Sequence, residues 1–203
     1  MLSPQRLIQY DANAPTETAT ATFGLGCFWG PDAAAGAKDG VVRTRVGYAG
    51  GTKPDPSYRA IGDHTEVVQV EYDPETISFG DLLAWALTKH DPRQQVDKRQ
   101  YQNIVFTERP AQRQQLREFL DDSEWDRDRI ATRLERLDGF TIAEDYHQKF
   151  RIRGSRWITD AFEEAGYDTA GVRESPAAAK LNAHAAGHDV SAPFLPESYD
   201  PDV

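Results

Sequence analysis

The sequence predicts an α+β fold in which a two-layer core of mixed β-sheet and helices carries irregular loops and a partly helical C-terminal extension. Short apolar or alternating runs predict several strands, and amphipathic segments with helix-start signals are interleaved with them. Strands interleaved with two amphipathic helices are typical of a two-layer domain. The chain has 203 residues, of which 39% are hydrophobic, and this is enough for one core with an appendage.

The N-terminal part of the chain predicts a leader, a strand, a turn and a short helix. Residues 1–18 lack a sustained hydrophobic period and are interpreted as a loose leader. Residues 19–25 are mainly apolar and are followed by a glycine, which predicts a buried strand. Pro31 and the alanine-rich residues 33–38 predict a short helix. Cys27 is therefore expected at the strand-to-helix turn.

The middle of the chain predicts two more strands and a clear helix. Residues 41–48 and 66–72 have strand patterns, and the Gly- and Pro-rich residues 50–65 between them predict an irregular loop. A helix is expected to begin at Ser78, because Asp81 three residues later makes a start similar to a capping box. The His-Asp-Pro triplet that follows ends this helix.

The remaining chain predicts two further strands and several helical pieces. Residues 103–107 predict a short strand, and residues 110–122 predict a polar helix with a narrow apolar stripe. Residues 130–137 are interpreted as the last strand. Helical segments are expected at residues 158–165 and 175–186, among Gly and Pro residues.

Composition limits the partners and the compartment. The chain has 23 basic and 33 acidic residues, a net charge of −10, so binding to nucleic acid or an anionic membrane would be electrostatically unfavourable. No run approaches the ~20 apolar residues that span a bilayer, and the start of the chain lacks a signal-peptide pattern. A monomeric cytoplasmic protein is expected.

The chemistry of the sequence centres on Gly26-Cys27-Phe28-Trp29-Gly30, which contains the only cysteine. One cysteine excludes an internal disulfide and a cysteine-based zinc site, and the scattered histidines do not predict a metal site. At the head of a helix, the dipole and free amides favour thiolate. The adjacent aromatic rings suit a methyl thioether or sulfoxide. The alternative is a small buried cysteine beside two core aromatics.

Several ordered motifs give this stretch a family resemblance. GCFWG is followed by VGYAGG, a Pro-x-Pro-x-Tyr loop, His-x-Glu, a strand ending in Tyr-Asp-Pro, a helix ending in His-Asp-Pro, a Gln-Tyr pair and AEDYHQ. In this order and spacing the chain resembles the methionine sulfoxide reductase A family. The resemblance implies a ferredoxin-like core and a catalytic domain over residues 19–153, which leaves residues 154–203 as an extension of unknown role.

The resemblance also implies roles for individual residues. Cys27 matches the family's nucleophile, and Phe28 and Trp29 match the aromatic walls around the substrate methyl group. Asp97 matches a pocket aspartate, although the chain is shorter than the family pattern before Tyr101. The implied reaction is the reduction of methionine-S-sulfoxide, in oxidised proteins or as the free amino acid, which repairs oxidative damage.

Three further residues match groups that act on the sulfoxide oxygen. Glu66 matches the family's carboxyl group, and Tyr58 and Tyr101 match two tyrosines that hydrogen-bond the oxygen. A neutral carboxyl and phenols can donate protons or hydrogen bonds as the S–O bond breaks, which requires burial to raise the pKa of Glu66. The alternatives are a solvated charge at a strand edge for Glu66 and core tyrosines with wet hydroxyls for the other two.

The implied reaction leaves Cys27 as a sulfenic acid. Some relatives reduce this group with a second cysteine of their own chain, whereas this chain has no second cysteine, so its turnover must differ. The predicted reductant is therefore an external thiol, such as thioredoxin, glutaredoxin or a small thiol, and no bound cofactor is expected. Two alternatives remain: a redox sensor whose Cys27 sulfenate changes partner binding through the extension, and a cysteine hydrolase with Glu66 as base.

Overall fold

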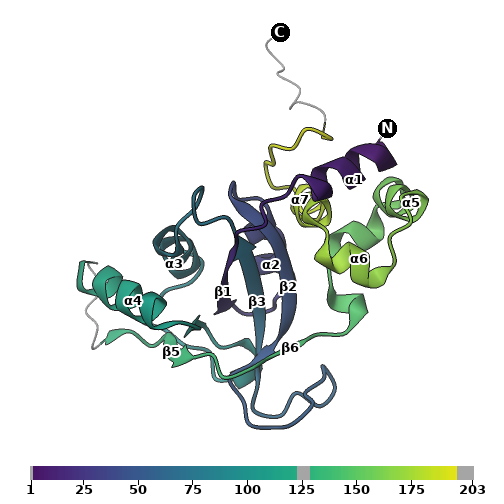
Figure 1. The fold of residues 1–203 in the computed structure, drawn as a ribbon. Helices are drawn as coiled ribbons and strands as arrows, with labels where there is room; N and C mark the ends of the chain where they lie inside the picture. The colour runs from purple at the N-terminus through teal and green to yellow at the C-terminus, as the bar shows by residue number, and fades with distance from the viewer. Residues whose placement is uncertain (1, 123–128, 196–203) are drawn as a thin grey trace.

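The structure of the protein, a computed structural model, describes residues 2–122 and 129–195. In these residues a six-stranded mixed sheet of order β5-β4-β1-β3-β2-β6 forms the centre, with helices packed beside it (Figure 1). The strands are β1 (Ala19–Gly24), β2 (Val41–Ala49), β3 (Thr65–Tyr72), β4 (Ile104–Thr107), β5 (Arg133–Arg136) and β6 (Phe140–Ile142). The α-helices are α1 (Pro4–Ala12), α2 (Trp29–Gly36), α3 (Phe79–Leu87), α4 (Pro110–Asp122), α5 (Arg156–Glu164), α6 (Thr169–Glu174) and α7 (Pro176–Ala185).

The four central strands have the ferredoxin-like arrangement that was predicted. Their spatial order is β4-β1-β3-β2 and each neighbouring pair is antiparallel. Helix α2 connects β1 to β2, and α3 lies between β3 and β4 in the chain, which gives the split β-α-β pattern. Strand β5 pairs in parallel with β4 and makes the sheet mixed.

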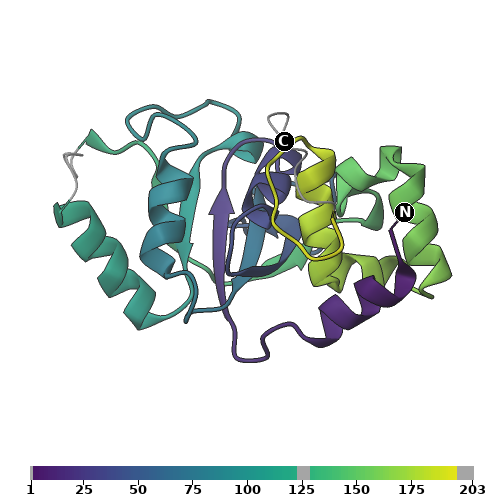
Figure 2. The same cartoon turned by 90° about the horizontal axis from the view of Figure 1, so that it is seen from above.

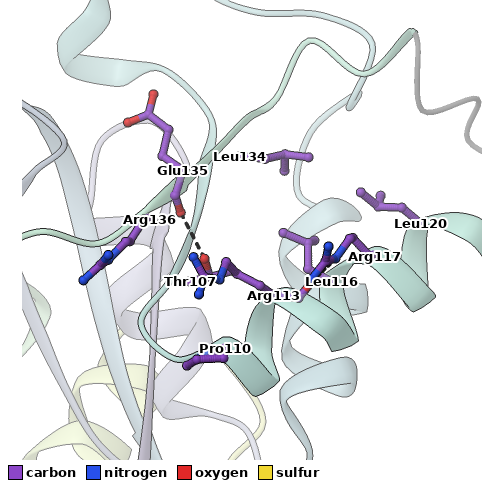
Figure 3. A pocket seen from close by; sticks show the side chains of 9 residues that line it. All are labelled: Thr107, Pro110, Arg113, Leu116, Arg117, Leu120, Leu134, Glu135 and Arg136. Carbon is purple, nitrogen blue, oxygen red and sulfur yellow. Dashed lines mark hydrogen bonds between the residues drawn. The ribbon is translucent and has the colours of Figure 1, made fainter.

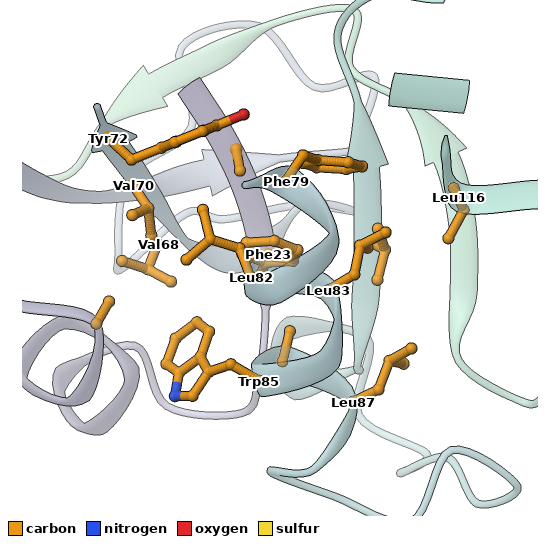
Figure 4. Close-up of a cluster of buried hydrophobic side chains, with 14 of the residues drawn as sticks. Phe23, Val68, Val70, Tyr72, Phe79, Leu82, Leu83, Trp85, Leu87 and Leu116 are labelled. Carbon is orange, nitrogen blue, oxygen red and sulfur yellow. The ribbon is translucent and has the colours of Figure 1, made fainter. Parts of the chain in front are cut away.

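The main core lies between one face of the sheet and α3 and α4 (Figure 4). Alternate residues of β1 and β3 point to this face, because successive strand side chains alternate. Helix α3 is fixed at its start by the predicted capping box: Asp81 N–H donates to Ser78 Oγ over 3.1 Å, and Ser78 N–H donates to Asp81 Oδ2 over 2.9 Å. The labelled side chains of this core are Phe23, Val68, Val70, Tyr72, Phe79, Leu82, Leu83, Trp85, Leu87 and Leu116.

The prediction of a loose leader over residues 1–18 is wrong, because these residues contain helix α1. Pro4 at the first helical position favours this start, and Leu7 is fully buried. Asp11 joins the helix to the extension through a 2.7 Å hydrogen bond from Ala177 N–H to Asp11 Oδ1. The leader is ordered by contacts with residues more than 150 positions away, which local periodicity cannot reveal.

Two smaller predictions are corrected, and one helix was missed. The helix expected from Pro31 to residue 38 begins two residues earlier, at Trp29, and ends at Gly36. The strand expected at residues 130–137 is shorter and is followed by β6, a three-residue strand that pairs with β2. Helix α6 was not predicted, because it has only six residues and buries none of them.

The C-terminal extension packs against α1 and α2 and shares a second apolar cluster with the N-terminal residues and Ile152. Figures 1 and 2 show α1, α5, α6 and α7 together at the end of the molecule opposite α4. None of the described helices is long and apolar enough to cross a membrane. The second cluster consists of Leu2, Leu7, Ile152, Ile158, Ala161, Phe162, Ala177, Ala178, Leu181, Phe194 and Leu195.

Candidate active site

Cys27 lies at the turn between β1 and α2, as predicted, and its side chain is exposed. Gly26 has a φ of +77°, a conformation that glycine adopts without strain, and it directs the chain from the strand into the helix. Partial desolvation and the charge of Glu66 raise the pKa of the Cys27 thiol, although the Trp29 N–H and Arg151 lower it. The amide at the helix start favours thiolate, as predicted, but desolvation outweighs it and the net shift of the Cys27 pKa is upward.

Glu66 points from β3 toward the start of α2 and is only 1% exposed. Phe28 N–H donates to Glu66 Oε2 over 3.2 Å, and Gln100 Nε2 donates to Glu66 Oε1 over 2.7 Å. Burial raises the pKa of Glu66, and this effect exceeds the lowering by Gln100, Phe28 and Lys98. The raised pKa agrees with the prediction and excludes a solvated strand-edge charge.

Aromatic rings line the side of the site formed by α2. Phe28 is buried, and its ring centroid lies 6.5 Å from that of Trp29 and 5.1 Å from that of His147. The Trp29 indole is stacked on Phe150, with centroids 3.8 Å apart and an interplanar angle of 5°. The start of α2 thus places two adjacent rings beside Cys27, where they form an apolar surface.

The structure brings Tyr58 and Tyr101 together beside these residues. Desolvation, the charge of Glu66 and a hydrogen bond to Tyr58 raise the pKa of Tyr101 to about 12, and Cys27 adds to this shift. Tyr58 is 40% exposed, and its backbone N–H donates to Glu144 Oε1 over 3.0 Å. The Tyr101 phenol therefore remains protonated near neutrality, and both hydroxyls can donate hydrogen bonds.

Asp97 is the one predicted site residue that the structure does not join to this group. Its side chain is exposed on the loop before η1 (Arg99–Tyr101), and no hydrogen bond or ion pair connects it to another residue in the described ranges. Arg99 fixes the neighbouring segment instead, because its side chain donates to the carbonyl oxygens of Asp63 and Gly50.

Three features of the site were not predicted as functional. Gln100 orients Glu66, and its only signal in the sequence is its position in the Gln-Tyr pair. Tyr48 donates to Glu144 Oε2 over 2.8 Å and so fixes the carboxylate that holds the Tyr58 backbone. His147, predicted to pack or hydrogen-bond on a helix, is buried on a 3₁₀ turn, η3 (Asp145–His147).

His147 packs among the rings of the site without a polar contact. Burial lowers its pKa, so the imidazole is neutral. In the part of the chain that the structure describes, both of its ring nitrogens and Trp29 Nε1 lack a hydrogen-bond partner. The described residues contain no group of three or more His, Cys, Asp or Glu that could hold a metal ion.

A groove of about 710 Å³ between α4 and β5 lies apart from this site (Figure 3). Its floor is apolar and its rim is mainly basic, and it contains no cysteine and no buried carboxyl. The groove therefore lacks the chemical groups of the Cys27 site. Its lining residues are Thr107, Pro110, Arg113, Leu116, Arg117, Leu120, Leu134, Glu135 and Arg136.

The fold and the site together define a thiol-dependent oxidoreductase, because an accessible thiol lies beside a buried carboxyl of raised pKa, two phenols and an aromatic surface. A sequence model of the peptide methionine sulfoxide reductase family matches residues 19–168. The chain therefore belongs to the peptide methionine sulfoxide reductase family. It is an oxidoreductase that acts on methionine sulfoxide in protein repair. The family assignment does not favour the redox-sensor alternative or the cysteine-hydrolase alternative.

Individual relatives agree with this assignment. The peptide methionine sulfoxide reductase of Drosophila melanogaster is 39% identical over 172 residues, which cover 83% of this chain and 69% of that protein. The MsrA protein of Natronomonas pharaonis is 42% identical over 146 residues, which cover 66% of this chain and 82% of that protein. The solved structure of methionine sulfoxide reductase A of Corynebacterium diphtheriae has a TM-score of 0.60 and 32% identity, covering 70% of this chain and 77% of that one.

Proposed function

We propose that this protein reduces the S epimer of methionine sulfoxide, peptide-bound or free, with Cys27 as the nucleophile. The observation that carries the proposal is the position of the Cys27 thiol near Glu66, whose buried carboxyl has a raised pKa. A carboxyl of this kind can be protonated at the pH at which a proton is needed. The choice of epimer rests on the family resemblance.

In the proposed reaction the Cys27 thiolate attacks the sulfoxide sulfur while Glu66 gives a proton to the oxygen. The hydroxyls of Tyr58 and Tyr101 donate hydrogen bonds to the same oxygen, and the substrate methyl group lies against Phe28 and Trp29. The attack forms a bond between the two sulfur atoms. As the S–O bond breaks and the oxygen passes to the Cys27 sulfur, this S–S bond breaks and its electron pair stays on the substrate sulfur. The substrate sulfur is reduced to the thioether of methionine, and the thiol is oxidised to a sulfenic acid.

The sulfenic acid is returned to the thiol by an external reductant. A first thiol attacks the Cys27 sulfur, water leaves, and a mixed disulfide forms. A second thiol, on the same donor or on another molecule, then releases Cys27 as a thiol and leaves the donor oxidised. The absence of a second cysteine in the chain supports this route, and thioredoxin, glutaredoxin and small thiols are the proposed donors.

Asp97 is retained as a prediction for substrate binding, as are a monomeric state and a cytoplasmic location. The same holds for the division between a catalytic domain over residues 19–153 and an extension over residues 154–203, whereas residues 1–18 contain α1 and are not proposed again as a loose leader. The family match continues to residue 168 and so includes α5. Crosslinking and sedimentation of the full chain would measure the oligomeric state.

Replacement of the nucleophile tests the proposal. We expect wild-type protein with excess dithiol to reduce the S epimer and to leave the R epimer unchanged. The Cys27→Ser variant should lose more than about a thousandfold in rate, because a hydroxyl is a far weaker nucleophile toward sulfur than a thiolate. Activity that survives in Cys27→Ser, or equal reduction of both epimers, would contradict the proposal.

A further inference from the structure

A buried polar network connects the active-site helix to the C-terminal extension. Asp32 of α2 and Asn182 of α7 are fully buried, and Lys149 is 1% exposed. Asn182 Nδ2 donates to Asp32 Oδ2 over 3.0 Å, and Lys149 Nζ lies 3.5 Å from Asp32 Oδ1. Thr44 Oγ1 donates to the same carboxylate oxygen, so both oxygens of Asp32 have partners.

The carboxamide of Asn182 has a second contact, on the segment that forms the aromatic surface. Its Oδ1 accepts the backbone N–H of Arg151 over 2.9 Å. Arg151 follows Phe150, whose ring is stacked on Trp29. One side chain of the extension therefore joins the start of α2 to the segment that supports the Trp29 indole.

Close packing of α2 against α7 leaves the Asn182 side chain and its partners little freedom to form other contacts. Helices α2 and α7 approach so closely that a Cβ atom on Gly36 would lie 2.4 Å from the carbonyl oxygen of Ala179. Gln148 fixes the same segment from the other side, because its amide donates to the carbonyl oxygens of Val46 and Ala143. An unpartnered buried amide or carboxylate is costly, so loss of the Asn182 carboxamide should move these groups.

We propose that Asn182 is a positioning residue for the methionine sulfoxide site, and that the extension serves to hold the Phe150 and Trp29 rings in place. The inference rests on the proposed function, because the position of Trp29 matters only where a substrate methyl group lies against it. Asn182 acts through Arg151 N–H and Asp32, and its side chain does not reach the reacting atoms. It lies in α7, beyond residues 19–168, which the family model matches.

The test compares Asn182→Leu with Leu181→Ala in the full-length protein. Asn182→Leu keeps a similar volume and removes both hydrogen bonds. Leu181→Ala weakens the second apolar cluster, to which Leu181 belongs, without touching the network. For Asn182→Leu we expect KM for methionine-S-sulfoxide to rise roughly threefold to tenfold, the effect of losing one or two hydrogen bonds. We expect kcat and the rate of Cys27 alkylation by iodoacetamide to change less than about twofold.

Leu181→Ala is expected to lower the midpoint of unfolding and to leave KM unchanged. Equal KM values for Asn182→Leu and wild type, or an equal rise in Leu181→Ala, would overturn the inference. If Asn182→Leu does not fold, Asn182→Ser gives the same measurement, because its hydroxyl is too short to bridge both partners. Failure of the proposed function has a different signature. In that case Cys27→Ser would still reduce methionine-S-sulfoxide, whatever the KM values of Asn182→Leu and wild type.

Discussion

Helices α2 and α3 are of similar length and both contribute to the main apolar cluster, yet they are held by different forces. Helix α3 has large apolar side chains, among them Leu82, Leu83 and Trp85, that pack on the sheet. Helix α2 buries only small residues and the charged Asp32, whose partners come from β2, the segment after η3, and α7. The helix beside the catalytic cysteine therefore depends on polar partners that are distant in the sequence.

This difference has a chemical consequence. Apolar packing tolerates side chains of similar volume, whereas a hydrogen-bonded buried charge requires specific partners at specific positions. The site also requires a rigid start for α2, because Phe28 N–H contacts the carboxylate of Glu66. We infer that the apolar helix sets the stability of the domain and that the polar helix sets the geometry of its site.

Among the variants that test this comparison, the largest effect is expected at the carboxyl that contacts the start of α2. Replacing Glu66 with Gln removes the proposed proton donor and should lower the rate near pH 7 about a hundredfold or more. Phe28 N–H can still donate to the amide oxygen, so folding should be retained. Steady-state reduction of methionine-S-sulfoxide measures the loss, and circular dichroism checks the fold.

The pH profile sharpens this prediction. Desolvation raises the pKa values of both Glu66 and Cys27, and the productive form pairs a thiolate with a protonated carboxyl. The thiolate–carboxylic acid pair is the minor tautomer of the singly ionised site, so the rate follows the two pKa values of the pair. In the wild type the rate should fall below the lower value, that of Glu66, because the fully protonated site has no thiolate. It should also fall above the upper value, that of Cys27, because the doubly ionised site has no protonated carboxyl. Glu66→Gln should instead show a rate that only rises with pH through the pKa of Cys27. A bell-shaped profile in this variant would contradict the assigned role.

The same comparison explains what could be predicted from the sequence. Helix α3 was predicted in place, because its start signal and its apolar pattern are local. The start of helix α2 was predicted two residues late, because its partners, Lys149 and Asn182, lie more than a hundred positions away. The residues around the cysteine were predicted through their motifs, whereas Gln100 and Tyr48 contribute through hydrogen bonds that no spacing reveals.

A change in α3 should affect stability and leave the site unchanged. Leu83 is fully buried in the main core, so Leu83→Ala should lower the free energy of unfolding by about 2–5 kcal/mol. Urea unfolding followed by far-UV circular dichroism measures this loss. The protein that remains folded should keep the wild-type KM, and a raised KM would show that α3 also positions the site.

The smallest effects are expected at one glycine in each helix. In Gly36→Ala the new Cβ would meet the backbone of Ala179 at 2.4 Å, and the cost of overpacking, about 1–3 kcal/mol, should exceed the gain in helix propensity. In Gly80→Ala the nearest atom is Ser78 Oγ at 3.5 Å, so the gain of up to about 1 kcal/mol should remain. Thermal unfolding of the two variants should therefore shift in opposite directions. A stabilising Gly36→Ala would mean that α7 can move away from α2 at no cost.

The central claim, a reductase that uses one cysteine and an external thiol, is tested most directly by a single turnover without reductant. Reduced wild-type protein is mixed with excess methionine-S-sulfoxide, and both the intact mass and the methionine formed are measured. We predict one methionine per chain and a gain of one oxygen atom that peptide mapping places on Cys27. Methionine formed without a change at Cys27, or oxygen on Cys27 without methionine, would contradict the claim.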